Sequence, residues 1–298
     1  MKRAISLCLA AIALSALLAG PARADTGGWA EMRHQFDYRH VRISVTDLGA
    51  TSRPGAVVHD ITYRAPGQDP VSAYLVTPSR PGRHPAAIFL HWLENSPDAN
   101  RTEFLDEAVA LAAGRDHVVS LLPQLVFPFD YGPVGDTRDR DAIIKQVIQL
   151  RRGLDLLDAR PDVDRGRVAV VGHDYGGMYA ALLSAVDRSR VTGAVIMAAD
   201  ATWANWFVLY FLDLPADQVA PYTATLSNLD PIRYLLHAPA RILLQYAADD
   251  FFIPISVADA MHAAAPPTSS YRTYETDHSL QIPAARHDRD RFLTRALR

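Results

Sequence analysis

The chain has 298 residues, of which 49% are hydrophobic, 21% charged and 9% aromatic, with 16 glycines and 20 prolines. These proportions are typical of a globular protein and exclude a disordered chain, a low-complexity tail or a coiled coil. A chain of this length can bury a sizeable core, as one large domain or two small ones.

The first 24 residues have the three-part pattern of a secretory signal peptide. The basic start Met1-Lys2-Arg3 precedes an uncharged run at 4–19 and the small-residue site Ala22-Arg23-Ala24. The run is short for a bilayer span, which takes roughly 20 apolar residues, so a cleaved signal is favoured over an anchor. The only cysteine, Cys8, lies in mid-run, which disfavours a lipoprotein. We expect cleavage before Asp25 and an exported protein, periplasmic or secreted.

Cleavage there would leave 27 basic and 33 acidic side chains, a net charge of −6. That balance argues against a nucleic-acid or anionic-membrane partner. The mature chain would contain no cysteine, which excludes cysteine nucleophiles, cysteine metal ligands and disulfides. No later run is long and apolar enough for a membrane span. The expected partner is a small-molecule substrate.

The order of predicted elements indicates an α/β protein. After an irregular or partly helical start, apolar patterning predicts strands near 41–45 and at 57–63, 71–75, 86–90, 118–122, 167–171, 191–197, 241–245 and 271–274. Helical spacing predicts helices at 101–113, 142–157, 175–186, 255–264 and 284–297. We expect one large sheet of about eight mostly parallel strands with helices on both faces.

About forty residues between the strands at 191–197 and 241–245 break this alternation. The segment is rich in aromatic residues and predicts a small helical cap over the carboxyl edge of the sheet. Helical spacing makes most of its rings packing residues, with one or two lining a pocket. The substrate-binding candidates are Trp203, Trp206, Tyr210 and Tyr222.

The stretch Gly172-His173-Asp174-Tyr175-Gly176-Gly177 joins a predicted buried strand directly to a predicted helix. Its glycines let the backbone bend sharply and let strand and helix approach closely. The central side chain, Asp174, then lies at the helix N-terminus, where backbone N–H groups favour negative charge. This context predicts a nucleophile elbow with aspartate at its tip.

At these residues the chain resembles the α/β-hydrolase superfamily, over essentially its whole mature length. Most members have serine where this chain has Asp174, and the sequence at 172–177 is similar to the elbow of epoxide hydrolases and haloalkane dehalogenases. Four other features resemble the dienelactone-hydrolase-like branch instead. They are the small insertion, the tripeptide His91-Trp92-Leu93, the stretch 100–105 and the run 160–177. The resemblance implies an α/β-hydrolase fold for residues 25–298, with residues 199–238 as the small cap insertion.

The resemblance also implies a triad in the chain order nucleophile, acid, histidine. The acid usually lies three residues before a Val/Ile-Pro pair, which selects Asp250 over Asp249, whose expected role is a turn cap. His278 precedes the last predicted helix, where the superfamily has its base. The implied triad is therefore Asp174, Asp250 and His278.

In the family, the loop after the third strand supplies one N–H of the oxyanion hole. His91 begins that loop, which makes it a candidate substrate-binding residue, and Trp92 takes the place of the family's usual glycine. We expect the backbone N–H groups of Trp92 and Tyr175 to form the hole, and His173 to be structural. No residue spacing resembles a zinc site and no phosphate-binding loop is present, so no metal or cofactor is expected.

An aspartate nucleophile favours one kind of chemistry. A carboxylate that attacks an sp³ carbon of a halide or epoxide forms an alkyl ester, which water activated by His278 can hydrolyse. On a carboxylic ester the same attack would give an anhydride, a less favourable intermediate. We expect a hydrolase with a covalent Asp174 alkyl-enzyme and a small to medium apolar substrate. An ester or lactone hydrolase in which Asp174 acts as a base, and a non-catalytic binding protein, remain open.

Overall fold

The computed structural model describes residues 26–93, 97–239 and 241–298. The predicted signal peptide at 1–24 lies outside these residues. Across the three described ranges, no helix is both long and apolar enough to cross a membrane.

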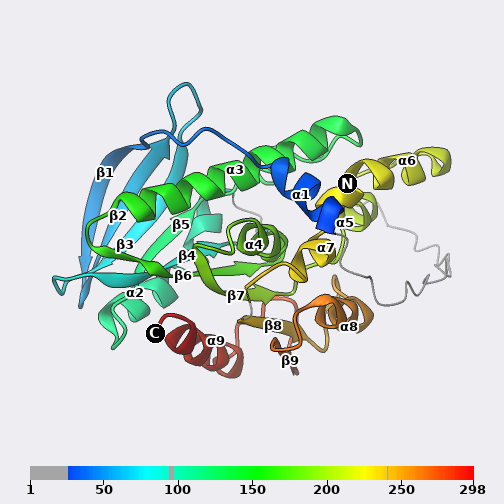
Figure 1. The fold of residues 1–298 in the computed structure, drawn as a ribbon. Coiled ribbons are helices and arrows are strands. Elements are labelled where there is room, and N and C mark those ends of the chain that lie inside the picture. The colour runs from blue at the N-terminus through cyan, green and yellow to red at the C-terminus, as the bar shows by residue number, and fades with distance from the viewer. Residues whose placement is uncertain (1–25, 94–96, 240) are drawn as a thin grey trace, which may run out of the picture.

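The described residues form one mixed sheet of nine strands in the order β1-β2-β3-β5-β4-β6-β7-β8-β9 (Figure 1). Strands β1 to β3 and the β3–β5 pair are antiparallel, and all later neighbours are parallel. The strands are β1 Ser44–Arg53, β2 Ala56–Arg64, β3 Val71–Pro78, β4 His84–Leu90, β5 Val119–Pro123, β6 Val163–His173, β7 Val191–Met197, β8 Ile242–Ala247 and β9 Ser270–Tyr274. The central strand β4 is buried along its whole length, as a parallel strand covered on both faces must be.

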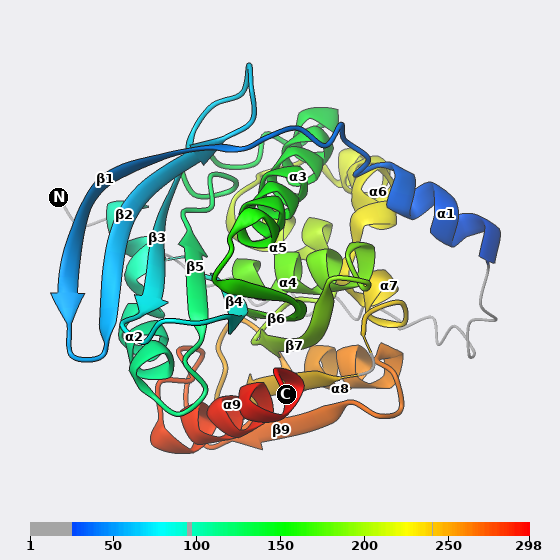
Figure 2. The same cartoon turned by 60° about the vertical axis from the view of Figure 1, so that its left-hand side comes forward.

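Helices cover both faces of this sheet. Figures 1 and 2 show α2 (Leu105–Ala113) and α9 (Pro283–Ala296) together on one face. The other face carries α1 (Thr26–His34), α3 (Thr137–Ala159), α4 (Tyr175–Val186) and α8 (Ile255–Ala264). Every residue of α4 is buried, because this Ala- and Leu-rich helix lies between the sheet and the surrounding helices.

Residues 199–238, the predicted cap insertion, contain α5 (Trp203–Tyr210), α6 (Ala216–Leu226), the short 3-10 helix η2 (Ser227–Leu229) and α7 (Pro231–Leu235). Figure 1 shows α5, α6 and α7 on the same side of the molecule, and α7 packs against α4. A further 3-10 helix, η1 (Pro97–Thr102), precedes α2.

The predicted fold class is confirmed, with nine strands in place of about eight. The helices at 175–186 and 255–264 and the strand at 191–197 have the predicted bounds. Strand β1 begins later than the predicted 41–45 and is exposed on both faces, so it has no alternation of buried and exposed residues. Helix α3 begins before residue 142, because the Asp136 side chain caps a polar first turn by accepting from Arg138 N at 2.8 Å.

Candidate active site

Asp174 lies at the junction of β6 and α4 in a conformation that residues with side chains rarely adopt, with φ 55° and ψ −119°. Glycines on either side make this turn possible. A Cβ on Gly176 would lie 2.1 Å from the Leu90 carbonyl oxygen, and a Cβ on Gly172 would lie 2.1 Å from the Gly176 oxygen. The close approach of α4 to β4 and β6 therefore requires glycine, and it presents the Asp174 carboxylate at the N-terminus of α4.

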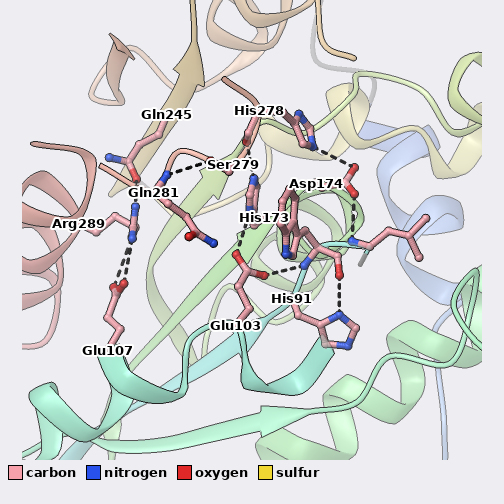
Figure 3. Close-up of polar contacts among 12 residues, drawn as sticks. His91, Glu103, Glu107, His173, Asp174, Gln245, His278, Ser279, Gln281 and Arg289 are labelled. Atoms are coloured by element: carbon pink, nitrogen blue, oxygen red, sulfur yellow. Dashed lines mark hydrogen bonds and ion pairs between the residues drawn. The ribbon is translucent and has the colours of Figure 1, made fainter. Parts of the chain in front are cut away.

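The three predicted triad residues lie together. His278 Nδ1 is 3.0 and 2.9 Å from the two carboxylate oxygens of Asp250, which also accepts from the Phe252 and Ile253 backbone N–H groups. Because Nδ1–H donates to a carboxylate, Nε2 of the neutral ring keeps its lone pair. Nε2 faces Asp174 Oδ1 at 3.9 Å, longer than a hydrogen bond (Figure 3).

Backbone donors hold the Asp174 carboxylate. Leu93 N donates to Oδ2 at 3.2 Å, and the Tyr175 N–H, which the sequence predicts as a donor to the substrate, bonds to this carboxylate instead. The prediction that Trp92 supplies the second donor is wrong, because Trp92 N donates to Glu103 Oε2 at 2.7 Å. Two backbone N–H groups thus hold the Asp174 carboxylate, as the donors of an oxyanion hole hold a negative charge.

Burial raises the pKa of Asp174 to about 6, while a protonated His278 ring, the charge of His173 and the two backbone N–H bonds pull it down. The carboxylate is therefore mainly ionised at neutral pH, although its side chain is only 5% exposed. An ionised carboxylate with one oxygen held and the other facing an imidazole can act as a nucleophile or as a base.

His91 does not reach the site as a substrate-binding residue, which corrects the prediction. Its ring is buried, its Nδ1 bonds to the Trp92 carbonyl at 2.9 Å, and its Nε2 accepts from Leu125 N at 2.9 Å. Burial lowers the pKa of His91 to about 3, so the ring is neutral. It joins the loop after β4 to the loop after β5 and has no ring nitrogen left for a substrate.

Two of the four aromatic candidates belong to the core. Trp203 is fully buried and donates from Nε1 to the Leu229 carbonyl at 2.8 Å. The Tyr222 hydroxyl donates to Asp139 Oδ2 at 2.7 Å and so joins α6 to the start of α3. Both residues are ordinary packing residues rather than substrate contacts, since their polar atoms are used within the fold.

The other two candidates lie at the site. The Trp206 ring stacks over His278 with centroids 6.2 Å apart, and the Tyr210 ring contacts Trp206 at 4.8 Å. Phe252, which the sequence analysis missed, contacts the His278 ring at 5.0 Å. Its position two residues after Asp250, in the loop that holds the acid, is the signal that could have identified it.

Three or more histidine, cysteine, aspartate or glutamate side chains arranged to hold a metal ion do not occur among the described residues.

The sequence matches no protein-family model and no curated protein. Solved structures are similar in fold. Acetyl xylan esterase from Paenibacillus sp. R4 has a TM-score of 0.67 at 17% identity, over 90% of this chain and 92% of its own. Acetyl xylan esterase 1 from Thermoanaerobacterium sp. JW/SL YS485 has a TM-score of 0.68 at 15% identity, over 92% and 93%.

A dienelactone-hydrolase-like protein from Klebsiella pneumoniae subsp. pneumoniae MGH 78578 has a TM-score of 0.55 at 19% identity, over 85% of this chain and 98% of its own. At these identities the likeness defines the fold, so the chain has the α/β-hydrolase fold. The reaction that this protein catalyses depends on the residues of its site and does not follow from the fold.

Proposed function

We propose that this protein is a hydrolase that forms a covalent alkyl ester on Asp174. One observation carries the proposal: Leu93 N and Tyr175 N hold the Asp174 carboxylate, while its Oδ1 lies 3.9 Å from His278 Nε2. A serine esterase leaves the two N–H groups free for the substrate's carbonyl oxygen. Here the protein's own carboxylate occupies them, so an ester carbonyl has no such donors, whereas an sp³ carbon needs none.

In the first step, Asp174 Oδ1 attacks the substrate carbon, and the bond from that carbon to the leaving group breaks with its electron pair on the leaving group. The Tyr175 hydroxyl and the Trp206 indole N–H are buried, and the Trp206 side chain acts on the Tyr175 hydroxyl as a hydrogen-bond partner. Burial raises the pKa of Tyr175 well above its ordinary value, so the phenol keeps its proton. We propose that these two groups are the donors that stabilise a halide, or the oxygen of an opened epoxide.

In the second step, water loses a proton to His278 Nε2 and attacks Cγ of the Asp174 ester. The negative charge develops on Oδ2, where Leu93 N–H already donates, and Tyr175 N–H bonds to the same carboxyl group. The ester C–O bond then breaks, the released alcohol takes the proton from His278, and the Asp174 carboxyl group loses its proton to restore the carboxylate. Asp250 holds the imidazole in the tautomer that this step needs.

The surroundings of the site support an apolar substrate. Exposed apolar side chains lie at the end of α5 and in the loop after Asp250, namely Leu209, Tyr210, Phe211, Phe251 and Phe252. The Phe251–Phe252 and Phe252–Tyr210 ring contacts join Tyr210, Phe251 and Phe252 into one patch. Exposed apolar patches of this kind mark binding sites. The expected substrate is therefore a small to medium apolar molecule.

The test is a single turnover in ¹⁸O-labelled water, on a panel of haloalkanes and epoxides together with aryl esters and lactones. A covalent Asp174 ester predicts that the first product keeps unlabelled oxygen from the enzyme, and that the Asp174 peptide gains one ¹⁸O. His278→Gln should accumulate the alkyl-enzyme, and Asp174→Asn should form none. If the first product contains ¹⁸O and the Asp174 peptide contains none, the proposal is overturned and Asp174 acts as a base that activates water. If none of the four substrate classes is turned over, a binding role is favoured.

We also propose that residues 1–24 direct export, to the periplasm or beyond the cell. The signal pattern of these residues supports this proposal. Cell fractionation with N-terminal sequencing of the exported chain should find Asp25 first, and a cytoplasmic chain that still begins at Met1 would refute it.

A further inference from the structure

Glu103, between η1 and α2, uses both of its carboxylate oxygens inside the protein. Oε1 is 2.7 Å from His173 Nδ1, and Oε2 accepts from Trp92 N at 2.7 Å. On the far side of its ring, His173 Nε2 lies 2.9 Å from the backbone oxygen of His278 (Figure 3). The Glu103 side chain is 5% exposed and that of His173 is fully buried.

The hydrogen-bond partners fix the protonation of His173. A carbonyl oxygen only accepts, so Nε2 carries a proton, while Nδ1 faces a carboxylate. Burial lowers the pKa of His173, but the Glu103 charge and hydrogen bond, the Asp174 charge and the His278 carbonyl raise it by more. Because Nδ1 lies 2.7 Å from a carboxylate oxygen and Nε2 lies 2.9 Å from a carbonyl oxygen, both ring nitrogens donate; His173 is then an imidazolium that forms a buried ion pair with Glu103.

This ion pair joins the three loops that make the site. Trp92 belongs to the loop after β4, and the next residue, Leu93, donates its N–H to Asp174. His173 is the last residue of β6, adjacent to Asp174, and His278 lies in the loop after β9. The Trp92 ring also stacks on His173 with centroids 5.0 Å apart and planes 9° apart.

We propose that the Glu103–His173 ion pair positions Leu93 N–H and His278 around Asp174 and places the positive charge that keeps the Asp174 carboxylate ionised. Both members are positioning residues, because they act on the reaction through Asp174 and His278. The proposal deepens the function proposed above and rests on it for any effect on turnover. Its effect on the ionisation of Asp174 needs no substrate.

The charges around Asp174 set the expected direction. His278 faces Asp174 from the loop after β9 and His173 from β6, and both favour the ionised carboxylate, as do the N–H groups of Leu93 and Tyr175. In Glu103→Gln, the amide oxygen can still accept from Trp92 N, and the amide N–H can donate to Nδ1 of a neutral His173 that keeps Nε2–H. This variant removes the charges of the pair and keeps its hydrogen bonds, so Asp174 should hold its proton to higher pH.

The experiment follows the Asp174 carboxyl carbon by NMR in the full chain labelled with ¹³C-aspartate, with Asp174→Asn used to assign its signal. The midpoint of the titration should rise by roughly 0.5–1 pH unit in Glu103→Gln, from Coulomb's law at an effective dielectric constant of about 20. Glu107→Gln is the matched control. Glu107 is also a buried carboxylate in an ion pair, 2.9 Å from Arg289, and Figure 3 shows that pair apart from the Asp174 cluster. Its loss should leave the midpoint unchanged.

Further variants separate a charge effect from loosened structure. Glu103→Asp keeps the charge and should return the midpoint toward that of the native chain. His173→Gln should raise the midpoint on its own, and Glu103→Gln should add little to it if the two act as a unit. Near-UV circular dichroism checks the fold of each variant. If Glu103→Gln does not fold, the titration midpoints of Glu103→Asp and His173→Gln test the proposal in its place.

An unmoved midpoint in both Glu103→Gln and His173→Gln would overturn the proposal, as would an equal shift in Glu107→Gln. Because the titration uses no substrate, its result is independent of the ¹⁸O experiment. If Asp174 proves not to form an ester, a shifted midpoint still establishes the ion pair. If an alkyl-enzyme forms and the midpoint does not move, only the role of Glu103 and His173 fails.

Discussion

Replacing Gly176 by alanine tests how tightly the elbow is built. The new Cβ would lie 2.1 Å from the Leu90 oxygen, 2.5 Å from the Leu90 carbonyl carbon and 2.6 Å from the His91 oxygen. Ordinary contacts of a Cβ begin near 3.4 Å. The atoms in the way belong to the backbone at the end of β4, so the strand or α4 must move by roughly 1.3 Å.

The cost should exceed the gain in helix propensity. Alanine is better than glycine inside a helix by about 1 kcal/mol, whereas overpacking of a core costs about 1–3 kcal/mol and more when backbone has to move. We expect Gly176→Ala to lose more than about 3 kcal/mol of unfolding free energy. Gly177→Ala, whose Cβ would lie 2.9 Å from the Met197 oxygen, should lose about 1–2 kcal/mol.

Gly132→Ala is the control, because its Cβ would meet only the Phe211 ring, at 3.8 Å, and should change stability by about 0.5 kcal/mol or less. Urea unfolding followed by tryptophan fluorescence measures all three variants. A loss below about 1 kcal/mol in Gly176→Ala, or a larger loss in Gly132→Ala, would refute the geometric reasoning.

Three further outcomes follow from the site. Because burial raises the pKa of Asp174 to about 6 from 3.8, the folded chain holds this proton more tightly, and Asp174 lowers stability as pH rises through that window. On going from pH 4 to pH 8, urea unfolding should therefore show Asp174→Asn gaining about 2.5 kcal/mol over the native chain, and equal pH profiles would count against the raised pKa. Turnover should fall below about pH 6 as Asp174 takes its proton, which a kcat/KM profile would show. Tyr222→Phe should lower the free energy of unfolding by about 1 kcal/mol, because it removes the hydrogen bond to Asp139, and it should keep full activity. Tyr210→Phe, next to Phe252, should alter KM. The reverse pattern in stability and kinetic assays would contradict these placements.

Periodicity was sufficient to predict most of the architecture. The helix at 175–186 has small and apolar residues on every side, and the strand at 191–197 is a short continuous apolar run, so both bounds followed from local sequence. Strand β1 was misplaced because all its side chains are exposed, which leaves no buried face to produce a pattern. The glycines around Asp174 identified the elbow because a backbone contact at 2.1 Å tolerates no Cβ.

The parts of the site that sequence could not supply depend on contacts between distant segments. Whether Trp92 or Leu93 directs its N–H at Asp174 is decided by Glu103, which binds the first of the two. At the start of a predicted helix, Glu103 resembles any acidic residue of a first turn, and its partner His173 lies 70 residues away in the chain. Helical spacing likewise treats Trp203 and Trp206 alike, although only Trp206 stacks over His278.

The edge strand at the antiparallel end of the sheet affects strand pairing between molecules of this protein. Between Asp47 and Gly49 the pairing of β1 with β2 shifts, the Asp47 carboxylate accepts from Gly49 N at 2.9 Å, and Gly49 has φ 150°. Such a bulge bends the outermost row of peptide groups, so a strand from another molecule finds no regular partner there. At the opposite end β9 has only five residues. A nine-stranded sheet is a large template for edge-to-edge pairing, and the bulge at one border and the short strand at the other both limit such pairing between molecules.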